Sequence, residues 1–459
     1  MRVTEHAERV AKLVAEFRAI PPDAPVRLAK RTSNLFRARV ATGTPGLDVS
    51  GFDHVLSVDP VTRRAQVEGM VTYERLVDAT LPYGLMPLVV PQLKTITLGG
   101  AVTGVGIESS SFRNGTPHES VCEMEILTGD GRVVVARPDG ADDPGEHAEL
   151  FRAFPNSYGT LGYALRLEIE LEPVKPFVAL RHLRFGSTKE LFAELERLCS
   201  AAAAGAERVD FVDGTVFSRD EAYLSVGTFV DEAPYLSDYT YTHIYYRSIQ
   251  RYREDYLTMR DYLWRWDTDW FWCSRAFGVQ RPLVRRLLGR RRLRSDVYWK
   301  VVAFERRYRL NARLERLRGL PRREDVVQDI EVGLDRAEEF ADYFLREVPI
   351  SPFWICPLRQ RDDDALWPLY TFDPGRLYVN FGFWSTVPLA PGQADGDHNR
   401  GIEAMVSFLG GRKSLYSTSF YSPEEFWRLY NGPAYDVVKK GYDPDGRLLD
   451  LYAKCVQRR

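Results

Sequence analysis

One stretch of the sequence concentrates residues that can hold an anionic ligand. Residues 95–115, TITLGGAVTGVGIESSSFRNG, contain five glycines and six threonine or serine hydroxyls. Glycine lets the backbone approach a ligand closely, and successive backbone N–H groups form a concave nest for phosphate. The hydroxyls add donors for phosphate oxygens. We therefore interpret this stretch, the cradle, as part of a cofactor site; the alternative is a pair of turns between strands.

The spacing within the cradle excludes two common nucleotide-binding loops. No Gly-Lys-Ser/Thr follows the glycines, so the cradle is not a Walker loop. Gly100, Gly104 and Gly106 do not give G-x-G-x-x-G, and no strand-to-helix switch is expected around them. The cradle therefore belongs to a nest of another type.

Two further segments can complete a cofactor site. Residues 30–34, KRTSN, offer cations, hydroxyls and an amide that suit a diphosphate, although a basic strand edge explains them equally well. A second glycine loop, residues 157–162, precedes a predicted strand. Glu108 can either contact the ligand or orient a loop N–H. The predicted cofactor-binding residues are Arg31, Thr32, Ser33, Asn34, Pro91, Thr97, Leu98, Gly99, Gly100, Thr103, Gly104, Gly106, Glu108, Ser109, Ser110, Gly159, Thr160 and Gly162.

Acidic and phenolic side chains on two predicted strands are candidates for proton transfer. Asp329 and Glu331 alternate with Val327, so they share one face of a strand. An acid there can reach a substrate; the alternative is a solvent-facing, salt-bridged strand. The predicted catalytic residues are Asp329, Glu331, Tyr378 and Tyr435, with Tyr370, Asn380 and Tyr416 as weaker candidates, and no metal site is predicted.

The hydrophobic patterns predict an α+β fold in 459 residues. Residues 4–19 have helical periodicity, and 121–136 alternate around Thr-Gly-Asp-Gly as a hairpin. From residue 178 the order strand, helix, strand, strand predicts an antiparallel sheet with helices on one face. The predicted domains are 1–175, which holds the cradle, 176–420, with a basic aromatic helical insertion at 245–310, and a helical segment at 421–459.

Several motifs resemble one enzyme family. The runs PQLKTITLGGAVTGVGIESSS, EILTGDGRVVVARP and SYGTLGYALRLEIELEP are similar to the PCMH-type flavin domain of the vanillyl-alcohol oxidase superfamily. VVQDI, FWICP and YSPEEFWRLYNGPAYDVV are closest to the Delta-24 sterol reductase (diminuto) family. The resemblance runs from about Arg27 onward. It implies a two-subdomain FAD-binding domain, a cap domain over the flavin, and a C-terminal segment that folds back onto the FAD domain.

The resemblance also implies the cofactors. Some relatives bond the flavin to a histidine, but the cradle has none, and His118 follows at the wrong place. We therefore expect non-covalent FAD, with NADPH as co-substrate. His118 is expected to be an ordinary surface or interdomain residue.

The resemblance implies reduction of a lipid carbon–carbon double bond. An isolated alkene must be protonated first or in concert, which favours branched or exo-methylene alkenes that give a tertiary centre. The acid then needs a dry pocket that raises its pKa. Arginine makes up 52 of the 62 basic residues, which indicates a GC-rich bacterial genome.

Bacterial proteins of this kind include reductases that convert a 10-methylene to a 10-methyl fatty acyl chain. We expect such a methylenestearoyl substrate, made by an upstream methyltransferase in fatty acid biosynthesis. The alternatives are a sterol side chain, an FAD-dependent alcohol oxidase or dehydrogenase, and a lipid-binding protein with a vestigial flavin site.

The insertion has a second interpretation. Residues 281–294 hold seven arginines, beside Trp264, Trp266, Trp270, Phe271 and Trp272. Aromatic and arginine side chains together are typical of a peripheral membrane segment, here 264–294. The alternative is a solvated helical insertion with a core-facing aromatic stripe.

Bulk properties constrain location and partners. The net charge of −2 gives no argument for nucleic acid. Five scattered cysteines do not suggest disulfides. The charged N-terminus is not a signal peptide, and no run of 18 apolar residues occurs. These features predict a cytoplasmic protein, with the inner face of the cell membrane as the site of any peripheral contact.

Overall fold

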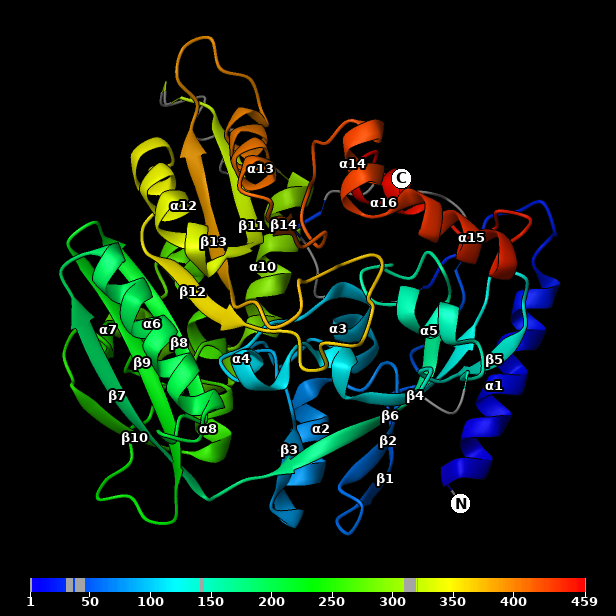
Figure 1. The fold of residues 1–459 in the computed structure, drawn as a ribbon, viewed down its shortest axis with the longest axis horizontal. Helices are drawn as coiled ribbons and strands as arrows, with labels where there is room; N and C mark the ends of the chain where they lie inside the picture. The colour runs from blue at the N-terminus through cyan, green and yellow to red at the C-terminus, as the bar shows by residue number, and fades with distance from the viewer. Residues whose placement is uncertain are drawn as a thin grey trace.

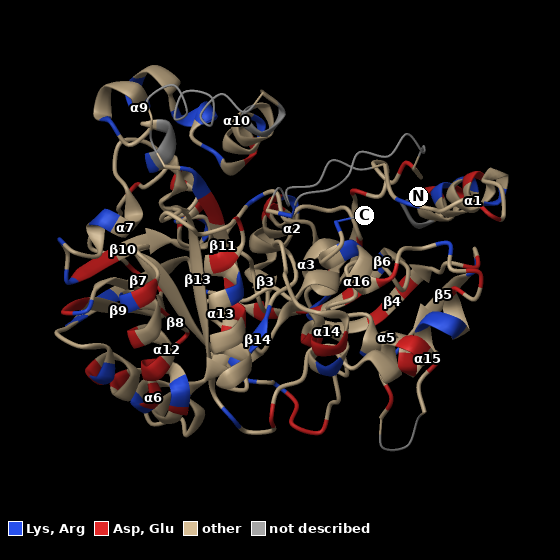
Figure 2. Cartoon of the chain, turned by 90° about the horizontal axis from the view of Figure 1, so that it is seen from above, with Lys and Arg blue, Asp and Glu red and all other residues tan. Residues whose placement is uncertain are grey.

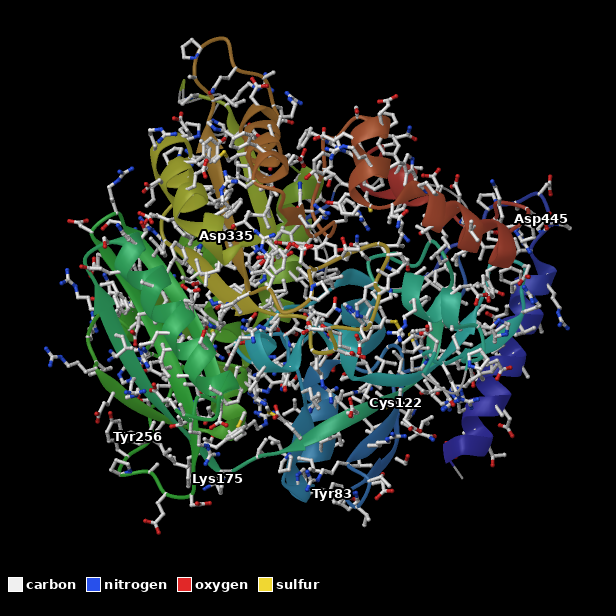
Figure 3. The ribbon with its side chains drawn as sticks, viewed as in Figure 1. Tyr83, Cys122, Lys175, Tyr256, Asp335 and Asp445 are labelled. Atoms are coloured by element: carbon white, nitrogen blue, oxygen red, sulfur yellow. The ribbon has the colours of Figure 1, made fainter. Side chains whose placement is uncertain are left out.

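The computed structural model describes residues 2–29, 36–37, 46–140, 144–308, 319 and 321–458, which build two antiparallel sheets lying side by side (Figure 1). The polypeptide passes from the first sheet to the second at Lys175, in the short link between them (Figure 3). No described helix is long and apolar enough to span a membrane. The predicted α+β class is confirmed.

The first sheet has six strands in the order β1-β2-β6-β4-β5, with β3 also paired to β6. Its strands are β1 (Val55–Asp59), β2 (Arg64–Glu68), β3 (Leu85–Pro87), β4 (Val121–Leu127), β5 (Val133–Ala136) and β6 (Tyr163–Pro173). The helices around it are α1 (Arg2–Ala19), α2 (Tyr73–Thr80), α3 (Leu98–Gly104), α4 (Ser111–Asn114) and α5 (Ala148–Ala153). Strand β6 is central to this sheet, and the alternation of buried and partly buried residues along it shows that one of its faces is packed against the core.

The second sheet has eight strands in the order β10-β7-β9-β8-β12-β13-β11-β14, all antiparallel. They are β7 (Phe177–Phe185), β8 (Phe211–Ser218), β9 (Glu221–Val230), β10 (Glu254–Thr258), β11 (Arg323–Gly333), β12 (Phe353–Leu358), β13 (Tyr378–Pro388) and β14 (Arg412–Lys413). Helices α6 (Thr188–Ala203), α12 (Leu334–Glu347) and α13 (Asp397–Phe408) cover one face.

The two faces of β13 pack against different parts of the molecule. Phe381 and Phe383 pack against α12, with ring centroids 4.7 Å from Phe340 and 4.4 Å from Phe344. The residues between and beside them, Asn380 among them, face the first sheet, as the period of two requires. The face opposite α6, α12 and α13 is therefore available here to build a site.

The insertion between β9 and β11 is less uniformly helical than the sequence predicts. It contains α7 (Tyr245–Ser248), α8 (Met259–Leu263), α9 (Pro282–Leu288) and α10 (Ser295–Tyr308), but also strand β10. This strand, which contains Tyr256 (Figure 3), pairs with β7 and forms one edge of the sheet. The purely helical expectation was wrong there because five residues of alternation are obscured by the basic and aromatic composition around them.

The C-terminal helices α14 (Pro423–Leu429), α15 (Gly432–Tyr442) and α16 (Leu451–Cys455) lie across the first sheet's side of the molecule (Figure 1). Lys439 donates to the Thr160 carbonyl, 2.8 Å away, and Lys454 to the Tyr158 carbonyl, 2.6 Å away. The last segment thus holds the second glycine loop in place.

Helix α1 is fixed to the first sheet by a buried ionic cluster. His6 contacts Glu68 at 2.7 Å and Glu125 at 3.0 Å, while Arg9 contacts Glu68 at 2.7 Å. Burial lowers the pKa of His6, but hydrogen bonds to Glu125 and Glu68 outweigh it and raise the pKa to about 9. The imidazolium therefore stabilises the docked helix below pH 6.5, and this contribution is lost as the pH rises through about 9.

We expect His6→Ala to destabilise the protein by roughly 1.5–3 kcal/mol at pH 6, the range for hydrogen bonds that involve charged groups. The difference from wild type should shrink at pH 9.5, where His6 is neutral in both states. Thermal unfolding at the two pH values measures it. His54→Ala is the control, because His54 also contacts Glu68, at 2.9 Å, but its side chain is 45% exposed. An equal loss in both variants, or a loss independent of pH, would contradict the assignment.

Candidate active site

A cavity of about 460 Å³ lies between the cradle and the face of the second sheet opposite α6, α12 and α13. One wall is formed by the cradle and by residues 158–165. The opposite wall contains Asp329, Trp354, Asn380, Trp384, Ser414 and Tyr416, and the insertion adds Trp270, Phe271 and Cys273. Backbone-rich and aromatic surfaces thus face each other across one space.

The cradle is not the open loop that the sequence predicts, because its first half forms helix α3. Thr97 caps this helix, and its hydroxyl accepts a hydrogen bond from the Gly100 N–H at 3.2 Å. Gly99 packs so closely on Gly69 that an added Cβ would lie 2.8 Å from the Gly69 carbonyl oxygen. Tertiary packing and the cap therefore outweigh the low helix propensity of the glycines.

Half of the predicted cofactor-binding residues line the cavity: Pro91, Thr97, Gly99, Gly100, Thr103, Gly104, Gly106, Gly159 and Gly162. Arg31, Thr32, Ser33 and Asn34 lie outside the described residues. Leu98 is a core residue. Thr160 donates to the Ser157 carbonyl at 2.8 Å, and Ser110 to the Leu88 carbonyl at 2.8 Å, so both support backbone behind the wall rather than the cavity itself.

Glu108 and Ser109 also lie behind the wall. The Glu108 carboxylate accepts from the Ser109 N–H at 2.9 Å and from Arg265 at 3.3 Å. Burial raises the pKa of Glu108 to about 7, against the attraction of Arg265. The Ser109 hydroxyl lies 2.9 Å from the Tyr262 hydroxyl. Of the two roles that the sequence left open for Glu108, orienting a loop N–H is the one with a contact.

Three residues in the cavity wall have buried polar atoms without a partner in the described structure: Nε of Arg37, Nε2 of Gln92 and Oδ1 of Asn380. Leaving such groups unpaired costs free energy, so a polar ligand is expected to complete them. A flavin dinucleotide has ring donors and acceptors for an amide pair, phosphates for an arginine, and a flat apolar ring for aromatic walls. The residues present therefore fit FAD.

Asp329 is the carboxyl group that faces the cavity. It accepts a bond from the Asn380 amide at 3.4 Å and is also bonded by Tyr416. Burial raises its pKa to about 7 despite these two hydrogen bonds, and no cation pairs with it among the described residues. The predicted alternative of a solvent-facing, salt-bridged strand does not hold at this position.

Glu331 lies two residues along the same face of β11 but not on the cavity. Its carboxylate accepts from the Tyr370 hydroxyl and, at 3.4 Å, from the Ser414 hydroxyl. Burial, with a smaller contribution from the nearby Asp329, raises the pKa of Glu331 to about 8. Because Ser414 itself lines the cavity, it connects Glu331 to the space that Asp329 faces.

Two predicted catalytic tyrosines lie away from the cavity. The Tyr378 hydroxyl accepts from the Asp373 N–H at 3.0 Å, at the far end of β13. The Tyr435 hydroxyl accepts from the Leu451 N–H at 3.1 Å and its ring lies against Trp427. Both are structural contacts, so the expectation that they meet the substrate does not fit their positions. Tyr416, a weaker candidate, lines the cavity instead.

The aromatic wall contains residues that sequence reasoning missed. Trp354 lies on β12 and Trp384 on β13, and Gly382 of β13 is the register partner of Trp354 on one side and of Asp329 on the other. A Cβ on Gly382 would come within 2.5 Å of both the Asp329 carboxylate and the Trp384 ring. The Gly-Phe-Trp sequence at 382–384 is therefore what makes room for Asp329.

Neither histidine nor a reactive cysteine is placed to bond a flavin here. His118 is fully buried against Trp367 rather than on the surface, and burial lowers its pKa to about 3. Cys273 lines the cavity, but burial raises the pKa of its thiol to about 12. No histidine is among the described residues of the cavity wall.

Comparison with known proteins agrees with this site. A family model described as an FAD binding domain matches residues 3–137. Human Delta(24)-sterol reductase is 27% identical over 418 residues, which cover 88% of this chain and 76% of that protein. The pea Delta(24)-sterol reductase is 24% identical over 506 aligned positions, covering 100% of this chain and 85% of that protein. Decaprenylphosphoryl-beta-D-ribose oxidase of Mycolicibacterium smegmatis is 32% identical over 130 residues, 28% of this chain and 27% of that protein.

Fold and site together define an FAD-dependent oxidoreductase with a PCMH-type FAD-binding domain. The resemblance to the Delta-24 sterol reductase family, drawn above from sequence motifs, is confirmed by relatives from animals and plants.

We expect the purified protein to carry FAD, and Gly104→Val to weaken its retention about tenfold. An added Cβ at Gly104 would lie 3.3 Å from the Tyr158 ring, which also lines the cavity, so valine must shift this part of the cavity wall. Overpacking of this kind costs roughly 1–3 kcal/mol. The ratio of flavin to protein absorbance after gel filtration measures retention. Gly441→Val is the matched control, because nothing lies within 4 Å of a Cβ there. Acid precipitation should release all flavin to the supernatant; flavin that stays with the pellet would contradict non-covalent binding.

Proposed function

We propose that this protein reduces a carbon–carbon double bond of a lipid, with NADPH as the source of electrons. The observation that carries the proposal is Asp329, a half-buried carboxyl group that faces the cavity beside aromatic rings and pairs with no cation among the described residues. Similarity to Delta(24)-sterol reductases over 88% of the chain, including the second sheet, supports it.

Asp329 would supply the proton. A carboxyl group with a pKa of about 7 is substantially protonated at neutral pH, unlike an ordinary aspartate. An unpolarised alkene accepts a hydride only when its other carbon gains a proton. FAD, when bound and reduced, supplies that hydride. The substrate thus gains one proton and one hydride, and the aspartate that has lost its proton must be neutralised again.

The neighbouring groups suit this cycle. Asn380 and Tyr416 hold the Asp329 carboxyl in position by hydrogen bonds. Glu331, with a pKa of about 8, holds a second proton behind Ser414, and Asp329 raises the pKa of Glu331 by like-charge repulsion. A negative charge formed at Asp329 would therefore strengthen the hold of Glu331 on its own proton, which keeps two adjacent negative charges from forming in the dry wall.

We infer a 10-methylene fatty acyl chain as the substrate, reduced to the 10-methyl chain. Protonation of its exo-methylene carbon leaves the positive charge on a tertiary carbon, which a concerted hydride quenches. The rings of Trp354 and Trp384 offer an apolar, electron-rich wall for such a centre. A methyltransferase that installs the methylene group would act upstream. A sterol side chain with a trisubstituted alkene meets the same chemical requirement and is the alternative substrate.

An alcohol oxidase or dehydrogenase is the second candidate function. The match to an oxidase from Mycolicibacterium smegmatis favours it, but covers only 28% of this chain. In that reaction Asp329 would act as a base rather than as an acid.

Anaerobic mixing with NADPH separates these functions. The reductase should lose its flavin absorbance near 450 nm with NADPH and recover it when a methylene-acyl lipid is added without oxygen. Bleaching by an alcohol substrate and not by NADPH would instead establish the oxidase. Protein that binds no FAD would favour a vestigial site and contradict both enzymes.

We expect Asp329→Asn to slow reoxidation by the alkene about 100-fold or more, within the range of general acid catalysis. Bleaching by NADPH should continue, because that step does not use the acid. In wild type, kcat/KM for the alkene should fall as the pH rises above about 7, since Asp329 must carry its proton. Stopped-flow absorbance measures both half-reactions. Asp325→Asn, at an exposed position of the same strand, is the control. Unchanged reoxidation in Asp329→Asn would exclude this residue as the donor.

A further inference from the structure

Helices α9 and α10 form a projection beside the second sheet, away from its helix-covered face (Figure 2). Their outer sides are unusually apolar. Leu283 and Leu287, four residues apart on α9, are 72% and 83% exposed. Val301, Phe304 and Tyr308, at helical spacing on α10, are also exposed, and the last two rings lie 4.6 Å apart. Clustered exposed apolar side chains mark a surface that meets another apolar phase.

The aromatic residues that the sequence favoured for this contact are elsewhere. Trp264, Trp266, Trp270, Phe271 and Trp272 are all buried, and two of them line the cavity. The core-facing aromatic stripe is therefore the correct interpretation of 264–272. The surface candidates are instead the aliphatic and aromatic residues further along the insertion.

The arginines of this region fall into two groups. Arg285 pairs with the buried Asp269, Arg290 with Asp238 at 2.6 Å, and Arg294 with Glu74 at 2.7 Å. These three attach the projection to the body. The remaining exposed cations, Arg281, Arg286, Arg291, Arg292 and Lys300, have no ion-pair partner among the described residues.

The inner side of the projection joins the cavity wall. Leu288, Leu293 and Tyr298 belong to one apolar cluster with Trp270 and Cys273, which line the cavity. Trp270 and Phe271 turn toward it through two consecutive residues with φ of 44° and 57°. Non-glycine residues rarely adopt such values, and strained backbone of this kind is typical of functional sites. One side of the projection thus faces outward and the other borders the cavity.

We propose that the α9–α10 projection docks on an anionic lipid bilayer and that the cavity receives its lipid there. Exposed leucine and phenylalanine side chains would enter the apolar region while unpaired guanidinium groups contact headgroup phosphates. The second half of the proposal rests on the lipid substrate proposed above. Docking itself depends only on the surface.

Vesicle flotation of the FAD-loaded protein tests docking. Vesicles of phosphatidylglycerol and phosphatidylcholine should bind it at least tenfold more tightly than vesicles of phosphatidylcholine alone, and 0.5 M salt should weaken binding, as screening of exposed charges requires. The double substitution Leu283→Glu and Leu287→Glu should reduce binding at least tenfold. Arg286→Glu with Arg291→Glu should do the same and remove the preference for anionic lipid.

Val437→Glu is the matched control, since Val437 is 70% exposed on α15, outside the projection. Unchanged flavin content in every variant shows that the fold is kept. Binding that ignores vesicle charge, or that survives the leucine substitutions, would overturn the proposal. A wild-type dimer that the leucine substitutions dissociate, without vesicle binding, would assign the surface to a second copy of this chain instead.

Two substrate formats separate this proposal from the proposed function. In Leu283→Glu/Leu287→Glu, reoxidation by a methylene-acyl lipid should persist in detergent micelles and fall at least tenfold in vesicles. If neither format reoxidises wild-type flavin while vesicle binding is intact, the proposed reaction fails and docking stands. If both formats work equally in this variant, delivery from the bilayer is excluded.

Discussion

The arrangement of the two sheets depends on one buried guanidinium. Arg265, from the insertion, contacts Asp213 of β8 at 2.8 Å and Glu108 of the cradle at 3.3 Å, and lies over the Tyr262 ring at 4.1 Å. Asp213 also accepts from the Trp354 indole at 3.1 Å. Burying these charges is costly unless all of them remain together, and removing one partner of such a set costs about 3–5 kcal/mol. The cradle, the second sheet and the insertion are therefore locked in one geometry, and the cavity is the space that this geometry leaves.

Two pairs of carboxyl groups near the cavity differ in whether a cation lies beside them. Glu108 and Asp213 lie beside a permanent cation, although burial still raises the pKa of Glu108 to about 7. Asp329 and Glu331 lie on β11, and their hydrogen-bond partners are tyrosine, serine and amide groups. Burial therefore raises the pKa of both. A carboxyl group without a cation is a poor structural element but a suitable acid, because it keeps its proton at neutral pH. Position completes the distinction, because Asp329 lines the cavity whereas Glu108 and Asp213 lie behind its wall.

Local patterns in the sequence predict much of the fold. Alternation located β4, β6 and β11, and helical periodicity located α1 and α6, within a few residues. The period of two also placed Asp329 and Glu331 on one face. It could not show that Asp329 meets the cavity while Glu331 is covered by Tyr370, because that depends on Gly382 and Ser414, which reach β11 only through strand pairing.

Long-range contacts explain the other differences between the sequence predictions and the structure. The pairing of Arg265 with Glu108 joins segments far apart in the chain, and no local pattern distinguishes this arginine from the others around it. Likewise, the cradle forms a helix because Gly99 packs on Gly69, a contact that propensity does not include. The motif resemblance identified the cofactor class, whereas the aromatic wall opposite the cradle required the folded chain.

The sequence suggested either a core-facing aromatic stripe or a membrane-contacting segment for the insertion. Each interpretation fits a different part of it. Its first part, 264–272, is core and cavity wall; its second part, α9 and α10, exposes apolar and cationic side chains. The buried pair of Arg285 with Asp269 lies where these parts meet and fixes α9 against the aromatic part. Because α9 and α10 contribute no strand to the sheet, their outward-facing residues can vary without disturbing the register that positions Asp329. The cavity wall therefore connects the residues suited to chemistry with those suited to contact with a lipid phase. The outward-facing residues of the projection can still be substituted without changing the residues around Asp329.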